Sequence, residues 1–237
     1  MGPAVRLLIL NINPSAETRQ GVRRIARALS RVAPAETSIA IRHFARVRED
    51  ALPEVDGIVI GPQGVPFDAY GEPRRTHLFE LLRHVSGPPV AGGRIRPVLG
   101  ICGGHQALVL AHGGAIAPVH GGLATGSYAG HVKETGLRHV APELASDPLA
   151  AALPGEFVVS HVEGVSRLPD EFELVGAGSP CRVQLVRYRG RPVWGAQFHP
   201  ERGGDGDRFL RAWLSVVSEG RRKCNGRPSP ADNPRPS

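Results

Sequence analysis

Residues 97–110 read Pro-Val-Leu-Gly-Ile-Cys-Gly-Gly-His-Gln-Ala-Leu-Val-Leu, and this stretch decides the fold. Pro97 to Cys102 is an apolar run typical of a buried strand, and Gly103 to Leu110 can begin a helix directly after it. A side chain at such a sharp strand-to-helix turn is pushed above the sheet. The stretch therefore predicts an α/β protein in which Cys102 stands at the carboxyl end of a buried strand.

The chain before this stretch alternates in the same way between strands and helices. Val5 to Ile12 is apolar and β-prone, and Ala16 to Val32 then places apolar residues at helical spacing. Further strands are predicted at Ser38 to Phe44 and Gly57 to Ile60, and a helix at His77 to Val85. Strands that alternate with amphipathic helices favour a mostly parallel sheet covered on both faces. We therefore expect a single three-layer α/β domain.

The chain after this stretch changes character. Ala115 to Ala196 holds short strands and turns, with strands predicted at Phe157 to Ser160, Val183 to Tyr188 and Val193 to Gln197. A last helix follows, and its apolar stripe ends at Val217. We expect the folded domain to comprise residues 1–219, followed by a disordered, basic, Pro-rich tail at residues 220–237.

Composition and charge limit the possible partners. The chain has 237 residues, of which 41% are hydrophobic and 22% charged, as is usual for a soluble globular protein. Its net charge is +7, but the predicted tail alone carries five basic residues and one acid. Since the body holds only the remaining +3, a surface for nucleic acid is not expected.

Three cysteines without C-x-x-C spacing favour neither a disulfide framework nor a zinc ribbon. The apolar run Leu7 to Leu10 is too short for a signal peptide or a membrane span, so a reducing cytoplasm is the expected location. His, Asp and Glu residues do not cluster at ligand spacing. We therefore expect neither a metal nor another cofactor.

The predicted turn has the form G-x-C-x-G, with Gly100 and Gly104 two residues to either side of Cys102. Glycine removes the Cβ atoms that would clash where strand and helix cross. The following helix offers unpaired N–H groups and a positive dipole end, which favour a thiolate and can stabilise an oxyanion. Two interpretations stay open here: a nucleophilic cysteine, or a small buried hydrophobic side chain, the usual fate of a lone cysteine.

A nucleophilic thiolate needs a base and a group that orients the base. Of the ten histidines, only His199 stands in a segment suited to this role, at the end of the predicted strand Val193 to Gln197. Glu201 follows two residues later, and in an extended segment side chains at i and i+2 point the same way. Glu201 can therefore lie beside the imidazole of His199, fix its tautomer and stabilise its charged form.

Residues 100–106, Gly-Ile-Cys-Gly-Gly-His-Gln, and residues 197–201, Gln-Phe-His-Pro-Glu, closely resemble the two signatures of the class I, triad-type glutamine amidotransferases. The resemblance spans about Val5 to Val217. It implies a flavodoxin-like domain with a mostly parallel central sheet and a small antiparallel sheet, and a catalytic triad of Cys102, His199 and Glu201. Such a triad hydrolyses the side-chain amide of L-glutamine to glutamate and ammonia through a thioester.

Between the signatures the chain looks most like the GMP synthase type of glutaminase domain. The resemblance implies an oxyanion hole made by the backbone N–H groups of Gly61 and Gly103. It also implies substrate-binding residues, although a structural role for the histidine among them stays open: Gln106, Ser160, His161 and Val162. The chain departs from the usual residues of the family at positions that bear on substrate preference, namely Ile60, Val65 to Phe67, Gly103 and Glu163.

Three functions remain possible on these grounds. The first is a glutaminase that passes ammonia to a separate synthetase, since neither a Ser-Gly-Gly-x-Asp-Ser loop nor G-x-x-x-x-G-K-[ST] is present. The second is a freestanding hydrolase of γ-glutamyl peptides or amides that uses the same triad. The third is a non-catalytic binding or regulatory module, which the complete set of three triad residues disfavours.

Overall fold

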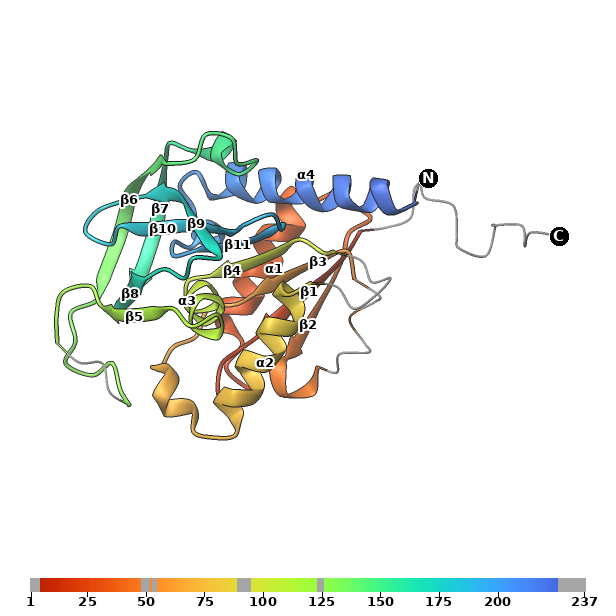
Figure 1. Ribbon diagram of the computed structural model, residues 1–237. Helices are drawn as coiled ribbons and strands as arrows, with labels where there is room; N and C mark the ends of the chain where they lie inside the picture. The colour runs from red at the N-terminus through yellow and green to blue at the C-terminus, as the bar shows by residue number, and fades with distance from the viewer. Residues whose placement is uncertain (1–4, 48–51, 53–54, 89–94, 123–125, 226–237) are drawn as a thin grey trace.

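The computed structural model describes residues 5–47, 52, 55–88, 95–122 and 126–225. One sheet of nine strands, in the order β2-β1-β3-β4-β11-β10-β9-β6-β7, runs through the molecule (Figure 1). Its strands are β1 (Arg6–Asn11), β2 (Ser38–His43), β3 (Gly57–Ile60), β4 (Val98–Ile101), β6 (Glu134–Pro142), β7 (Gly155–His161), β9 (Phe172–Ala177), β10 (Val183–Tyr188) and β11 (Val193–Ala196). A separate antiparallel pair consists of β5 (Ala115–Pro118) and β8 (Glu163–Arg167).

The sheet has two halves of different direction. In the parallel half, β2, β1, β3, β4 and β11 all run the same way. In the antiparallel half, β10, β9, β6 and β7 continue the sheet with alternating direction. The predicted α/β class with a parallel centre is confirmed. Most of the short strands between Ala115 and Ala196 extend the central sheet.

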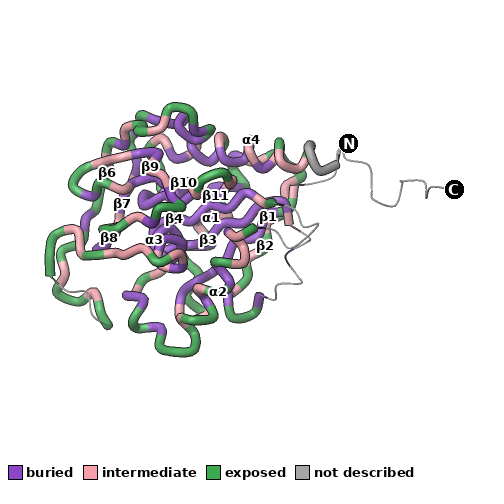
Figure 2. The backbone as a smooth tube through the Cα atoms, in the orientation of Figure 1, coloured by how far each residue is buried: buried purple, intermediate pink, exposed green. Residues whose placement is uncertain are grey.

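Among the described residues, four α-helices cover the parallel half: α1 (Gln20–Val32), α2 (Arg74–Ser86), α3 (Gly103–Ala111) and α4 (Gly206–Asn225). Strand alternation sends Leu7 and Ile9 into the core under α1 and α4, and Leu8 and Leu10 into the core under α2 and α3. Figure 2 shows the result as strands β1, β3 and β4 buried along most of their length. Burial on both faces explains why these strands are continuous apolar runs.

Element boundaries differ from the sequence predictions at helix ends. Helix α1 begins at Gln20 instead of Ala16, because a turn closed by the N–H of Thr18 and the carbonyl of Ser15 precedes it. Helix α4 continues to Asn225, and therefore extends past residue 220, where the disordered tail is predicted to start. Arg221 lies 3.7 Å from the carboxylate of Asp56, and this contact holds the last turns of α4 against the domain. Residues 226–237 of the predicted tail lie outside the described residues.

Parallel topology brings the functional segments to one edge of the sheet. Strands β4 and β11 are neighbours, with Ile101 beside Ala196, so the residues that follow them leave the sheet together. Cys102 follows β4, and the segment that contains His199 follows β11. Within the described residues, we find no helix with the length and apolar character that a membrane span requires.

Candidate active site

Cys102 stands on a strained turn between β4 and α3. It has φ 52° and ψ −107°, and among the described residues it is the only one other than glycine with a positive φ. A Cβ at Gly100 would lie 2.6 Å from the carbonyl oxygen of Gly104, and a Cβ at Gly104 would lie 2.3 Å from that of Ile60. Both contacts are with backbone, so the turn requires glycine at both positions, as the G-x-C-x-G pattern predicts.

His199 is oriented by Glu201 through a hydrogen bond of 2.8 Å between Nδ1 and Oε1. Both side chains are buried. The spacing works through a different geometry from the extended segment we expected, because Pro200–Arg202 forms the 3-10 turn η5. Pro200 occupies the first position of this turn, where proline is favoured because a backbone N–H would have no partner there.

The ring of His199 sits in a field that favours its charged form. Burial acts to lower the pKa of His199, but the charges of Cys102 and Glu201 and the hydrogen bond to Glu201 outweigh burial and raise it to about 10. Among the described residues, Nε2 of His199 is buried without a hydrogen-bond partner, which leaves it available to a reacting group. An imidazolium next to a thiolate is the arrangement that a cysteine nucleophile uses.

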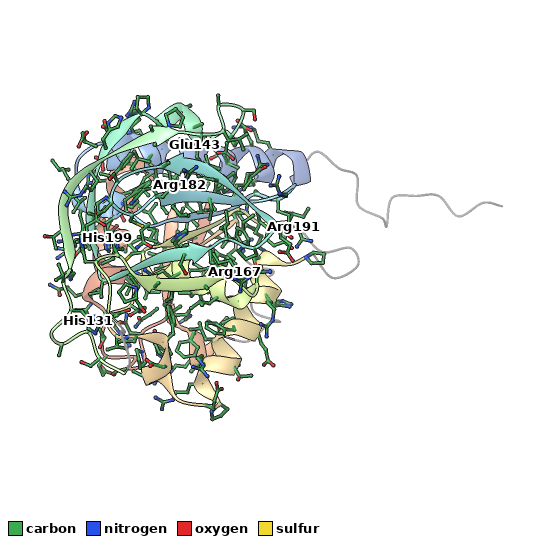
Figure 3. The ribbon with its side chains drawn as sticks, turned by 60° about the vertical axis from the view of Figure 1, so that its left-hand side comes forward. His131, Glu143, Arg167, Arg182, Arg191 and His199 are labelled. Carbon is green, nitrogen blue, oxygen red and sulfur yellow. The ribbon has the colours of Figure 1, made fainter. Side chains whose placement is uncertain are left out.

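A cavity of about 240 Å³ opens onto Cys102. Gln106, Ser160, His161 and Val162, the four residues predicted to bind substrate, all line it. The remaining lining residues come from the loop after β3, from the segment before β6 and from the start of β8: Gln63, Gly64, Tyr128, His131, Lys133 and Glu163. Figure 3 shows His131 and His199 on the same side of the molecule, opposite Arg191.

Three of these side chains link the walls of the cavity. The hydroxyl of Tyr128 donates to Oε2 of Glu163 at 2.7 Å, and Nε2 of Gln63 donates to that hydroxyl at 3.2 Å. Burial raises the pKa of Glu163 and of Tyr128 above their ordinary values. The sequence does not point to Tyr128, because it lies in a segment without hydrophobic periodicity.

The small residue at position 103 is explained by Gln63. A Cβ at Gly103 would come within 2.4 Å of Cγ of Gln63 and 2.7 Å of its backbone nitrogen. The space that a larger residue would fill is therefore already occupied. This departure from the family pattern does not widen the cavity.

Gly61 does not fit the oxyanion role predicted for it. Its N–H donates to the carbonyl of Leu10 at 2.9 Å, because the pairing of β1 with β3 continues one residue beyond Ile60. Gly61 also does not line the cavity, whereas Gln63 and Gly64 of the same loop do.

The buried cysteine and histidine residues other than Cys102 and His199 do not assemble a metal site in the part of the chain that the structure describes. Among the described residues, no group of three or more His, Cys, Asp and Glu side chains could hold a metal ion. His105 is fully buried on α3, and burial lowers its pKa to about 3, so it is a neutral core residue. Cys181 is buried and free, and burial raises its pKa to about 12.

The sequence matches the family model "Glutamine amidotransferase class-I" over residues 22–210. It is 32% identical over 197 residues to an aminodeoxychorismate synthase of Streptomyces griseus, with 80% of this chain and 24% of that protein covered. It is 30% identical over 154 residues to one of the subunits of the glutamine-hydrolysing GMP synthase of Archaeoglobus fulgidus, with 64% of this chain and 69% of that relative covered. The chain thus spans about a quarter of the first relative.

Solved structures show the same fold. A GMP synthase-type protein from Thermoplasma acidophilum superposes with a TM-score of 0.71 at 20% identity and covers 95% of this chain and 100% of its own. A glutamine amidotransferase from Thermotoga maritima superposes with a TM-score of 0.60 at 19% identity and covers 94% of this chain and 86% of its own. At these identities the likeness concerns the fold alone.

Proposed function

The chain belongs to the class I glutamine amidotransferase family, and on this premise we propose that it hydrolyses the side-chain amide of glutamine through a thioester on Cys102. One observation carries the proposal: three side chains lie together at the carboxyl edge of the parallel strands. They are the strained Cys102, the charged ring of His199 and the carboxylate of Glu201. Each has the chemistry that one step of amide hydrolysis needs.

In the proposed reaction the thiolate of Cys102 attacks the amide carbon of glutamine. The C–N bond then breaks, and the imidazolium of His199 gives its proton to the departing nitrogen. Ammonia is released, and the glutamyl group remains bound to the sulfur as a thioester. Water next attacks the thioester carbon while His199 takes a proton from it. The C–S bond breaks, glutamate leaves, and the thiolate and imidazolium are restored. Glu201 holds the ring through its hydrogen bond to Nδ1 and stabilises the imidazolium.

The oxyanion formed in both halves of the reaction needs donors close to the sulfur. We assign one to the backbone N–H of Gly103, the first residue of α3, where the N–H groups of the first turn have no intrahelical partner and the helix dipole is positive. Removal of one such donor commonly costs about 10² to 10³ in rate.

The cavity favours a small substrate. A volume of about 240 Å³ lies below the 300–1,000 Å³ usual for drug-sized ligands. Gln106, Ser160, His161 and Val162 are proposed to contact the glutamine. Because Nε2 of Gln106 already donates to two protein oxygens, a contact of Gln106 with substrate would use Oε1.

We also propose a separate synthetase partner that receives the ammonia. Support comes from two relatives that are subunits of glutamine-hydrolysing GMP synthases. The Streptomyces griseus relative is several times longer than the matched region.

The experiment that tests the function is a steady-state assay of glutamate release, with free glutamine and a γ-glutamyl dipeptide compared side by side. We expect free glutamine to be preferred, because the cavity, which Gln63 and Tyr128 help to line, is small. Preference for the dipeptide would instead establish a γ-glutamyl hydrolase. If neither is hydrolysed, labelling of Cys102 by a glutamine-like electrophile would show an intact site that needs its partner, and absence of labelling would contradict the proposal.

A further inference from the structure

A fully buried glutamine, Gln197, contacts the sulfur of Cys102 from outside the triad. Its Nε2 lies 3.8 Å from Sγ, within the range of an N–H···S hydrogen bond. Its backbone N–H donates to the carbonyl of Gln184 at 2.8 Å, which holds the residue in line with β10. The side chain has no access to solvent, so its polar atoms must find partners inside the protein.

A main-chain oxygen determines which way this amide points. Nε2 of Gln106 lies 2.6 Å from the carbonyl oxygen of Glu163, and because a carbonyl can only accept, the atom of Gln106 at this position must be the NH₂ group. The same NH₂ lies 3.2 Å from Gln197, so the facing atom of Gln197 must be its oxygen. The NH₂ group of Gln197 is then the one that faces Sγ, and the sulfur is the acceptor.

The carbonyl of Glu163 is itself held in place from the other side. Nδ1 of His161 lies 3.0 Å from it and must therefore carry a proton. Nε2 of His161 lies 3.4 Å from Oε2 of Glu134, while Oε1 of Glu134 accepts from Nε of Arg138 at 2.9 Å. Donors thus reach the Glu163 carbonyl from helix α3 and from strand β7, which fixes its position and the direction of the two glutamine amides.

We propose that Gln197 is a further catalytic residue whose side-chain N–H donates to Sγ of Cys102 and stabilises the thiolate, with Gln106 and the carbonyl of Glu163 as the groups that orient it. The proposal rests on the function above, in which Cys102 is the nucleophile. An N–H donor favours the anion because charge-assisted hydrogen bonds are stronger than neutral ones. The thiolate of Cys102 is then stabilised by two groups: the charged ring of His199 and the uncharged amide of Gln197, which does not titrate.

The neutral thiol has a competing contact, since Sγ also lies 4.0 Å from the carbonyl of Ser160, to which only an S–H could donate. Among the described residues, the titratable and charged groups around the sulfur and the cavity include His199, Glu201, His105, His161, Glu134, Arg138, Glu163, Tyr128, His131, Lys133 and Cys181. Because Gln197 is uncharged, its replacement by another uncharged side chain leaves these charges as they are.

The test is the pH dependence of alkylation at Cys102, read on the peptide that contains it, in the wild type, Gln197→Met and Gln184→Met. Gln184 is the matched control: it is fully buried beside Gln197, but its Nε2 donates to the carbonyl of Cys181. We expect the midpoint of alkylation to move upward by about one pH unit in Gln197→Met, with about tenfold slower alkylation below it. Equal midpoints in the two variants would overturn the proposal.

A measurement on the wild type covers the case in which Gln197→Met does not fold. The side-chain NH₂ resonance of Gln197, followed by ¹⁵N NMR, should shift with the same midpoint as alkylation of Cys102. A resonance that stays constant across that midpoint would contradict the hydrogen bond while leaving the nucleophile intact. A wild type whose Cys102 shows no alkylation midpoint would instead contradict the proposed function.

Discussion

The two halves of the central sheet contribute different parts of the site. The parallel half supplies the proposed nucleophile and base, which follow the neighbouring strands β4 and β11, and both strands are buried along their whole length. The antiparallel half supplies a wall of the cavity, at the turn between β7 and β8, and its strands β6 and β7 are partly exposed. The reacting groups must be positioned to within a fraction of an ångström, and they thus follow the more deeply buried strands.

The two halves are joined by a buried carboxylate. Asp147, in the connection after β6, accepts from Nε1 of Trp194 on β11 at 3.0 Å and from Arg187 on β10 at 3.3 Å. Its side chain is fully buried. The join therefore relies on directional polar contacts as well as on apolar packing.

The strongest test of the comparison replaces the proposed nucleophile. Cys102→Ser should lower kcat for glutamate release by at least about 10³-fold with little change in stability, because the hydroxyl is nearly isosteric and a much poorer nucleophile. Steady-state kinetics and thermal unfolding would measure both. The matched variant is Val162→Ala in the cavity wall, for which we expect mainly a higher KM. An equal loss of kcat in Val162→Ala would contradict the assignment of chemistry to the parallel half and substrate binding to the antiparallel half.

A second test concerns the packing of the parallel edge. Gly104→Ala should destabilise the fold by about 2–3 kcal/mol, because the new Cβ meets the backbone of Ile60, which has no room to move. Denaturant unfolding would measure the loss. Gly64→Ala is the control, since a Cβ there meets open space. A Gly104→Ala protein as stable as the control would show that the edge can relax.

The pH dependence of stability tests the charge on His199. Because its pKa is raised in the folded state, its stabilising effect is complete below about pH 6.5 and is lost as the pH rises through about 10. The difference in unfolding free energy between wild type and His199→Gln should shrink across that window by at most about 1.4 kcal/mol per pH unit. In a Cys102→Ser background this pH window should narrow, because the folded-state pKa of His199 should fall. An unchanged window would mean that Cys102 does not stabilise the charge on His199.

The smallest expected effect lies on α4, far from the edge with the site. Gly220→Ala should stabilise the protein by up to about 1 kcal/mol, since alanine favours a helix and a Cβ there meets Pro97 only at ordinary contact distance, 3.9 Å. Denaturant titration would detect it. No gain in stability would indicate that the last turns of α4 do not form in solution.

The parallel half can be predicted almost completely from the sequence. The pattern predicts β3 to the residue, at Gly57–Ile60, because a strand buried on both faces is a continuous apolar run with clear ends. The glycines around Cys102 are predicted for the same kind of reason: a backbone contact leaves room for one residue type only.

The rest of the site could not be predicted because it depends on long-range contacts. Tyr128 reaches Glu163 across 35 residues, and Gln63 packs on Gly103 from another loop. The oxyanion role predicted for Gly61 does not fit, because its N–H is used in the pairing of β1 with β3. The local sequence around Gly61 does not show this pairing. The strand β10 is predicted to the residue, but its antiparallel place in the central sheet follows from pairing partners distant in the sequence.

Asp56 ties together the beginning and the end of the described fold. Its carboxylate accepts from the backbone N–H of Arg6, where β1 starts, at 2.8 Å, and faces Arg221 near the end of α4 at 3.7 Å. Asp56 directly precedes β3, so this contact lies at the amino edge of the parallel strands, opposite the edge that carries Cys102. The described fold therefore begins and ends at the edge of the sheet opposite Cys102, so the cavity opens away from both Arg6 and Arg221.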